Sequence, residues 1–254
     1  MSGPQGLPEL LHELRLPTIA DDHQDVAIIA EREGWSFVQY LRALVDVELE
    51  GRRTRRIQRQ LKESGLPVEK SRATLRLERL SIHVRRQVAT LYESEFANRA
   101  ENVLIFGLPG RGKTHLACAI GHELLHHGHR VLFMPAYQLV QRLLVAKREL
   151  RLEKLIAQLD KYDVVIADDI GYVKQDRAEM EVLFTFLAAR YERRSVIITS
   201  NLVFSEWEKI FHDPMTTAAA IDRLVHHATI VEMGGGSVRE EEAKERQLAE
   251  ANVS

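Results

Sequence analysis

Residues 107–114 constrain this chain more than any other part of its sequence. They read Gly-Leu-Pro-Gly-Arg-Gly-Lys-Thr and fit G-x-x-x-x-G-K-[ST], a pattern in which a glycine-rich turn points backbone N–H groups at phosphate oxygens. An apolar segment at 102–106 precedes the turn and a helical pattern follows from 113, which is the setting that the pattern requires. We therefore expect the chain to bind the phosphates of a nucleoside triphosphate, with ATP as the expected nucleotide.

Two side chains at the end of this loop have separate expected roles. Lys113 can reach the β- and γ-phosphates, and the hydroxyl of Thr114 can bind Mg²⁺. The residues of this stretch expected to contact ATP are Gly107, Leu108, Pro109, Gly110, Arg111, Gly112, Lys113, Thr114 and His115.

From residue 101 onward, short apolar segments alternate with helical patterns. The predicted strands are 103–106, 131–134, 163–168, 195–200 and 229–233. The predicted helices are 113–127, 136–148, 176–191 and 216–226. This alternation predicts an α/β fold, in which a five-stranded parallel sheet is covered by helices on both faces.

Polar side chains end two of the predicted strands. Asp168 and Asp169 follow the apolar run 164–167 directly. We expect Asp168 to hold Mg²⁺ through water beside Thr114, and Asp169 to act as a general base toward the attacking water. Asn201 follows the next strand and would help to position that water if its strand lies between the other two.

The first 64 residues show helical patterns. Pro17 ends a first short helix, and Thr18 is expected to cap a second one that runs to about Glu33. Ser36 and Gln39 form a capping-box pattern at the start of a third helix, which carries an apolar stripe. This region predicts a small helical domain ahead of the sheet.

Positive charge is concentrated in residues 50–90, which hold twelve Lys or Arg against four Asp or Glu in a chain of net charge −2. Five of these cations recur at helical spacing on one face: Arg52, Arg55, Arg56, Arg59 and Lys62. We expect this face to contact the DNA backbone with little sequence preference, because phosphate contacts carry no sequence information. No aromatic side chains are interleaved between residues 50 and 90, which argues against stacking on bases as the main mode of binding. The alternative is an ordinary solvated helix face.

Length and composition fit one large domain and one small one, or two domains. We divide the chain into an N-terminal helical DNA-binding and assembly domain (1–65), a basic linker with a helix (66–100), an ATPase domain (101–240) and a charged tail (241–254). The single cysteine, Cys118, suits a reducing compartment, and no apolar run approaches the roughly 18 residues of a membrane helix. We expect a cytoplasmic location.

Four stretches of the sequence, 107–117, 166–172, 190–207 and 220–227, together resemble the IstB family. These are AAA+ ATPases that help the transposase of a class of bacterial insertion sequences, and the resemblance extends to residues 7–67. It implies a P-loop NTPase fold of the AAA+ type, with the strand that leads to Asn201 lying between those that lead to the phosphate loop and to Asp168. It also implies non-specific binding to duplex DNA, assembly into a homo-oligomer and recruitment of a partner transposase.

The resemblance adds two arginines to the expected site. Arg223, in Asp-Arg-Leu, matches the position of an arginine finger that reaches the nucleotide of a neighbouring subunit, and Arg239 matches a second sensor of ATP. Two departures from the family bear on these roles. Val238 stands where the family usually has an aromatic residue, and Asp169 stands where many members have Glu, which bears on the rate of hydrolysis.

Other functions compete with this interpretation. A loader of replicative helicases would share the architecture but prefer single-stranded DNA, and an ATP-binding switch would turn over negligibly because Asp169 replaces Glu. A metabolic kinase would need an acceptor pocket that nothing in the sequence supplies. The residues His122 to His126 fit H-E-x-x-H, a zinc-protease pattern, but they lie on the helix that follows the phosphate loop, one face of which must pack on the sheet.

Overall fold

The computed structural model describes residues 6–172, 177–202, 222 and 224–234. By its contacts the chain divides into two compact units, residues 1–59 and 60–254. Arg223 and Arg239 lie outside the described residues.

The first unit consists of three helices: α1 (Leu7–Glu13), α2 (Pro17–Glu33) and most of α3 (Phe37–Ser64). The capping box is confirmed, because the amide of Ser36 donates to Oε1 of Gln39 at 2.8 Å and the amide of Gln39 donates to the Ser36 hydroxyl at 3.3 Å. The prediction that Thr18 caps α2 is wrong. The helix begins at Pro17 with no side-chain cap at the residue before it.

Instead, a carboxylate from α3 accepts hydrogen bonds at the start of α2. Oε2 of Glu48 accepts hydrogen bonds from the amides of Thr18 at 2.8 Å and Ile19 at 3.2 Å. These are N–H groups of the first turn of α2 that have no partner within the helix, and a negative charge suits the positive end of the helix dipole. Glu48 is only 3% exposed, so α2 and α3 are joined by a buried polar contact.

The apolar core of this unit is small. Its buried side chains are Ile19, Val26 and Leu44. Most of the apolar stripe predicted on α3 lies at the surface of the described chain, with Phe37 93%, Leu41 63% and Leu49 58% exposed.

The second unit is built on five parallel strands in the order β2-β3-β4-β1-β5. Their bounds are Asn102–Phe106 (β1), Val131–Pro135 (β2), Val164–Asp168 (β3), Ser195–Ser200 (β4) and Ala228–Glu232 (β5). All five strands fall where the sequence predicts them, to within a residue or two. The α/β fold is confirmed, and β4 lies between β1 and β3 as the family resemblance implies.

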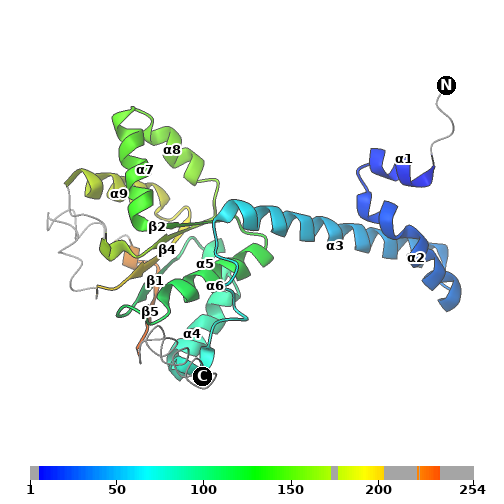
Figure 1. The fold of residues 1–254 in the computed structure, drawn as a ribbon, viewed down its shortest axis with the longest axis horizontal. Helices are drawn as coiled ribbons and strands as arrows, with labels where there is room; N and C mark the ends of the chain where they lie inside the picture. The colour runs from blue at the N-terminus through cyan, green and yellow to red at the C-terminus, as the bar shows by residue number, and fades with distance from the viewer. Residues whose placement is uncertain (1–5, 173–176, 203–221, 223, 235–254) are drawn as a thin grey trace, which may run out of the picture. The chain divides into compact units, whose positions relative to one another are not determined.

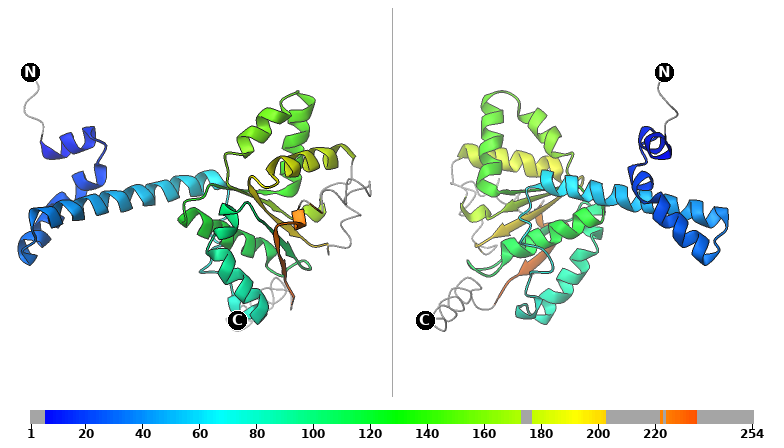
Figure 2. Two further views of the ribbon diagram at one scale, coloured as in Figure 1. Left: turned by 180° about the vertical axis from the view of Figure 1, so that it is seen from behind. Right: turned by 45° about the vertical axis from the view of Figure 1, so that its right-hand side comes forward.

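Helices cover both faces of this sheet (Figure 1). On one side lie α7 (Ala136–Arg148), α8 (Leu152–Leu159) and α9 (Arg177–Arg190), and on the other lie α4 (Ile82–Tyr92) and α6 (Lys113–His126). The further views show the same two layers (Figure 2). The side chains of β1 alternate between the two faces of the sheet. Leu104 and Phe106 pack into one core cluster, and Val103 and Ile105 pack into the other.

Two helical predictions differ from the structure or lie beyond it. Helix α8 was not predicted. The predicted helix at 216–226 lies mostly outside the described residues. Within that range, the described residues 222, 224 and 225 are helical.

Residues ahead of the sheet contribute to its core. Val84, Val88 and Leu91 of α4 and Phe96 of α5 (Glu95–Asn98) pack in the same cluster as Val103 of β1. The division of this unit into a linker, an ATPase domain and a tail stays a prediction. None of the helices in the described ranges has the length and apolar content needed to cross a membrane.

Candidate nucleotide-binding site

The glycine-rich loop connects β1 to α6 at the carboxyl edge of the sheet. Gly107 has φ 155° and a Cβ added there would lie 2.6 Å from the carbonyl oxygen of Met233, so a larger residue cannot stand at this position. Gly112, directly before α6, has φ 86°, a backbone conformation that other residues rarely adopt. The glycines of the motif are therefore explained by the backbone path of the loop and by its close approach to the end of β5.

Two threonine hydroxyls bind the carboxylate of Asp168 at the end of β3. The Thr114 hydroxyl donates to Oδ2 of Asp168 at 3.0 Å, and the Thr199 hydroxyl donates to Oδ1 of the same carboxylate at 2.6 Å. The Thr199 oxygen in turn accepts from the amide of Asp169 at 2.7 Å. Both oxygens of Asp168 are thus oriented by hydroxyl groups, one of which belongs to the phosphate loop helix.

Asp169 has φ 62°, in the left-handed region. A non-glycine residue with this conformation is uncommon and is often found at functional sites. The amide contact to Thr199 helps to hold the turn that places Asp169 directly after the strand.

Lys113 bends back over the loop from the first turn of α6. Its Nζ donates to the carbonyl oxygen of Leu108 at 3.0 Å, and the residue is only 7% exposed. A buried ammonium group needs polar partners. The lysine is therefore held against the loop whose backbone amides are expected to bind phosphate.

A cavity of about 370 Å³ opens beside the loop. It is lined by Phe106, Gly107, Leu108, Arg111, Asn201, Glu232, Met233 and Gly234. Nη1 of Arg111 and Oδ1 of Asn201 are buried and have no hydrogen-bond partner among the described residues. Asn201 also packs closely on Gly171, where an added Cβ would lie 2.0 Å from its Oδ1.

The polar groups of the site can be compared with what ATP and Mg²⁺ require. Two buried polar atoms in the cavity wall lack a partner in the described part of the chain, and one of them is a cationic donor that suits a phosphate. Thr114 and Asp168 offer the oxygen ligands that Mg²⁺ prefers. The site residues therefore fit a nucleoside triphosphate with a magnesium ion.

Most of the predicted site residues come together in this region, but His115 faces elsewhere. Its Nε2 lies 3.0 Å from the Thr74 hydroxyl and 3.2 Å from the Ser71 carbonyl oxygen, so its ring contacts the segment ahead of α4. Conversely, Thr199 and the cavity residues 232–234 are not among the residues predicted from the sequence. A signal for Thr199 was present in the sequence, since Thr199, Ser200 and Asn201 form a run of three polar residues after the apolar part of β4.

Two of the H-E-x-x-H residues contact the segment ahead of α4. Nε2 of His122 lies 3.0 Å from the carbonyl oxygen of Pro67 in a buried position, and Glu123 pairs with Arg72 at 3.4 Å. Cys118 is fully buried, and burial raises the pKa of its thiol to about 12. Both observations agree with the sequence interpretation of this helix as a packing element.

The five cations predicted to contact DNA divide into two groups. Arg52 donates to Oε1 of Glu48 at 2.8 Å and to the carbonyl oxygen of Arg15, and Arg55 contacts Glu48 at 3.2 Å and the Thr18 hydroxyl at 2.9 Å. These two arginines therefore make contacts within the first unit. Arg56, Arg59 and Lys62 are exposed, and no ion pair to them is found within the described ranges.

A parallel sheet in this order, with a glycine-rich loop after β1 and a hydroxyl–carboxylate network at the ends of β3 and β4, defines an ATP-binding P-loop protein of the AAA+ type. The family of IstB-like ATP binding proteins matches residues 9–246. The chain belongs to this family.

Individual relatives agree with this assignment. An insertion sequence ATP-binding protein of Sinorhizobium fredii is 47% identical over 93% of this chain and 80% of its own length. The ATP-binding protein of insertion sequence IS21 from Pseudomonas aeruginosa is 35% identical over 98% and 94% of the two chains. Among solved structures, that of DnaI has a TM-score of 0.56 at 20% identity over 67% of this chain and 96% of that one, a likeness of fold alone.

Proposed function

We propose that this protein is a Mg²⁺-dependent ATPase that assembles on duplex DNA with little sequence preference and recruits and stimulates a partner transposase. The observation that carries the enzymatic part is the contact between Thr114 of the phosphate loop and Asp168 of β3, beside a cavity in which two polar atoms lack partners among the described residues. A cytoplasmic location is part of the same proposal.

In this proposal the chain's own residues position the nucleotide and a water molecule. Bound Mg²⁺ would supply charge neutralisation for phosphoryl transfer. Lys113 and the loop amides hold the phosphates, Thr114 and Asp168 hold the ion, and Asp169 acts as the general base. Asn201, whose Oδ1 lies in the cavity wall, orients the water.

Assembly belongs to the proposal because of two further arginines. Arg223 would act as a finger on the nucleotide of a neighbouring subunit, and Arg239 would contact the nucleotide of its own subunit. Nucleotide bound between subunits would favour the assembled state by mass action.

The DNA and transposase parts have separate support. Arg56, Arg59 and Lys62 offer exposed positive charge on one face of α3, which suits a phosphate backbone. The two relatives named above are ATP-binding proteins of insertion sequences, an association that points to a transposase as the partner.

Sedimentation of the full chain with duplex or single-stranded DNA tests this function, with and without a non-hydrolysable ATP analogue. We expect large assemblies that need both duplex DNA and nucleotide. A preference for single strands would instead favour a helicase loader. Absence of nucleotide-dependent assembly on either DNA would contradict the proposal.

A further inference from the structure

Two turns meet at the edge of the sheet opposite to the phosphate loop. Glu192 lies in the turn between α9 and β4, while His226 and His227 directly precede β5. Strands β4 and β5 both pair with β1 in parallel, so the residues before each strand reach the same amino edge. One ligand atom from each of the three side chains lies within 4.8 Å of the others.

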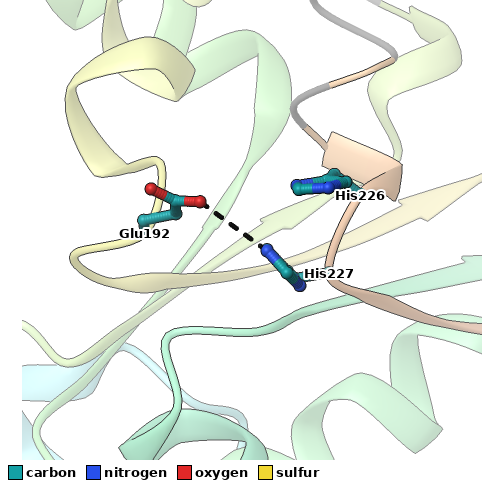
Figure 3. Close-up of side chains that lie close together, drawn as sticks. All are labelled: Glu192, His226 and His227. Atoms are coloured by element: carbon teal, nitrogen blue, oxygen red, sulfur yellow. Dashed lines mark ion pairs between the residues drawn. The ribbon is translucent and has the colours of Figure 1, made fainter.

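The three side chains face one another (Figure 3). Nε2 of His227 lies 3.6 Å from Oε1 of Glu192, and the two imidazole ring centroids are 4.1 Å apart. The adjacent cations are directed to other acids, since Arg193 pairs with Asp160 at 2.8 Å and Arg194 with Asp163 at 2.6 Å.

A second contact orients one of the imidazoles. The Tyr191 hydroxyl lies 2.9 Å from Nδ1 of His226. In the tautomer in which Nδ1–H donates to the Tyr191 oxygen, the lone pair of the ring lies on Nε2 and is available to a ligand. Histidines that bind metals are usually held in this way by a polar partner.

We propose that Glu192, His226 and His227 bind a transition-metal ion of the Zn²⁺ class. Two imidazoles and one carboxylate are a common zinc ligand set, with water in the fourth position. Tetrahedral coordination at about 2.1 Å would bring the ligand atoms to roughly 3.4 Å from one another. This needs a movement of about 1 Å by side chains that are all exposed.

Such an ion would join the turn before β4 to the turn before β5. It would be separate from the magnesium that the ATP site is expected to hold, because Mg²⁺ prefers oxygen ligands and that site lies at the opposite edge of the sheet. The proposal does not depend on ATP hydrolysis.

Calorimetric titration of the metal-stripped full chain with Zn²⁺ tests this site. We expect about one ion per chain for the wild type. His226→Ala, His227→Ala and Glu192→Gln should each weaken binding at least about tenfold, and Tyr191→Phe about tenfold through loss of the orienting contact. His83→Ala is the matched control, an exposed histidine on α4 that should leave binding unchanged.

Far-UV circular dichroism of each variant establishes that it is folded, and Glu192→Gln keeps the size of the side chain. The visible spectrum of the Co²⁺-loaded wild type gives a second readout, in which we expect the bands of four-coordinate cobalt. The proposal is overturned if the wild type takes up no Zn²⁺, or if folded His226→Ala and His227→Ala bind it as the wild type does.

Discussion

The hydroxyl of Thr114 and Oδ2 of Asp168 lie 3.0 Å apart although 54 positions separate the two residues in the sequence. Strand β4 lies between β1, which leads into the phosphate loop, and β3, which ends in Asp168. It adds Thr199, whose hydroxyl donates to the second oxygen of Asp168. The carboxylate therefore has a fixed orientation, with its oxygens already placed beside the phosphate loop. This arrangement is the structural basis for the magnesium and ATP site.

Asp168→Asn should remove most of the contribution of Mg²⁺ to ATP binding, because the amide keeps the shape of the side chain but loses its charge. We expect affinity in the presence of Mg²⁺ to fall about 10- to 100-fold, by analogy with other groups that hold a metal through an intervening ligand. Affinity measured in EDTA should change little. Equal losses with and without Mg²⁺ would argue against a role for Asp168 at the ion.

Thr199→Val should impair both stability and turnover. The substitution removes the hydrogen bond to Oδ1 of Asp168 and the acceptor of the Asp169 amide, at a cost of about 1–3 kcal/mol, while Thr114 still binds Oδ2 of Asp168. Thermal unfolding and ATP turnover measure the two effects.

Thr185→Val is the matched control for this change. Among the described residues its hydroxyl bonds to the carbonyl oxygen of Glu181 within α9, so the free energy of unfolding should change by less than about 0.5 kcal/mol. If the two valine variants behaved alike, Thr199 would have no special part in the site.

The order of the strands illustrates what the apolar pattern predicts and what it does not. Five short apolar runs placed the strands themselves, since buried parallel strands need apolar side chains on both faces. Nothing in those runs says that β4 pairs with β1. That arrangement came from the family resemblance, and with it came the expected place of Asn201.

The errors at α2 and α8 have physical causes. The amides at the start of α2 are satisfied by Glu48, thirty positions away from Thr18, and a local reading of caps cannot detect such a contact. Helix α8 has only eight residues and no side-chain cap at Arg151, so the sequence does not mark where this helix begins.

Stability of the first unit should depend on pH through Glu48. Burial alone would raise the pKa of this carboxyl, but hydrogen bonds from Arg52 and from the Ile19 and Thr18 amides hold the pKa below its ordinary value of 4.5. The charged form is thus favoured in the folded state. Its stabilising effect is fully present above pH 4.5 and is lost as the pH falls through the lower folded-state pKa.

Glu48→Gln should destabilise this unit by about 1–3 kcal/mol at neutral pH and flatten that acid dependence. Thermal melts of the full chain between neutral and acid pH, followed by circular dichroism, measure both effects. Glu50→Gln, on the exposed side of α3, is the control. An acid transition of unchanged size in Glu48→Gln would contradict this account.

Single substitutions of the α3 cations should have two different effects, one on DNA affinity and one on stability. Arg56→Ala or Arg59→Ala should weaken DNA binding equally for all sequences and lower the slope of log affinity against log salt by about 1. Arg52→Ala should instead destabilise the first unit, because it removes a partner of buried Glu48. Fluorescence anisotropy at several salt concentrations, together with thermal melts, distinguishes the two outcomes.

The most direct test of the whole account is the assembly of Lys113→Ala on duplex DNA, measured by sedimentation with a non-hydrolysable ATP analogue and Mg²⁺. Lys161→Ala, an exposed lysine before β3, is the matched control. We predict large nucleotide-dependent assemblies for the wild type and Lys161→Ala, and none for Lys113→Ala. Assembly of Lys113→Ala to the same extent as the wild type would contradict the claim that ATP bound at residues 107–114 drives this protein onto DNA.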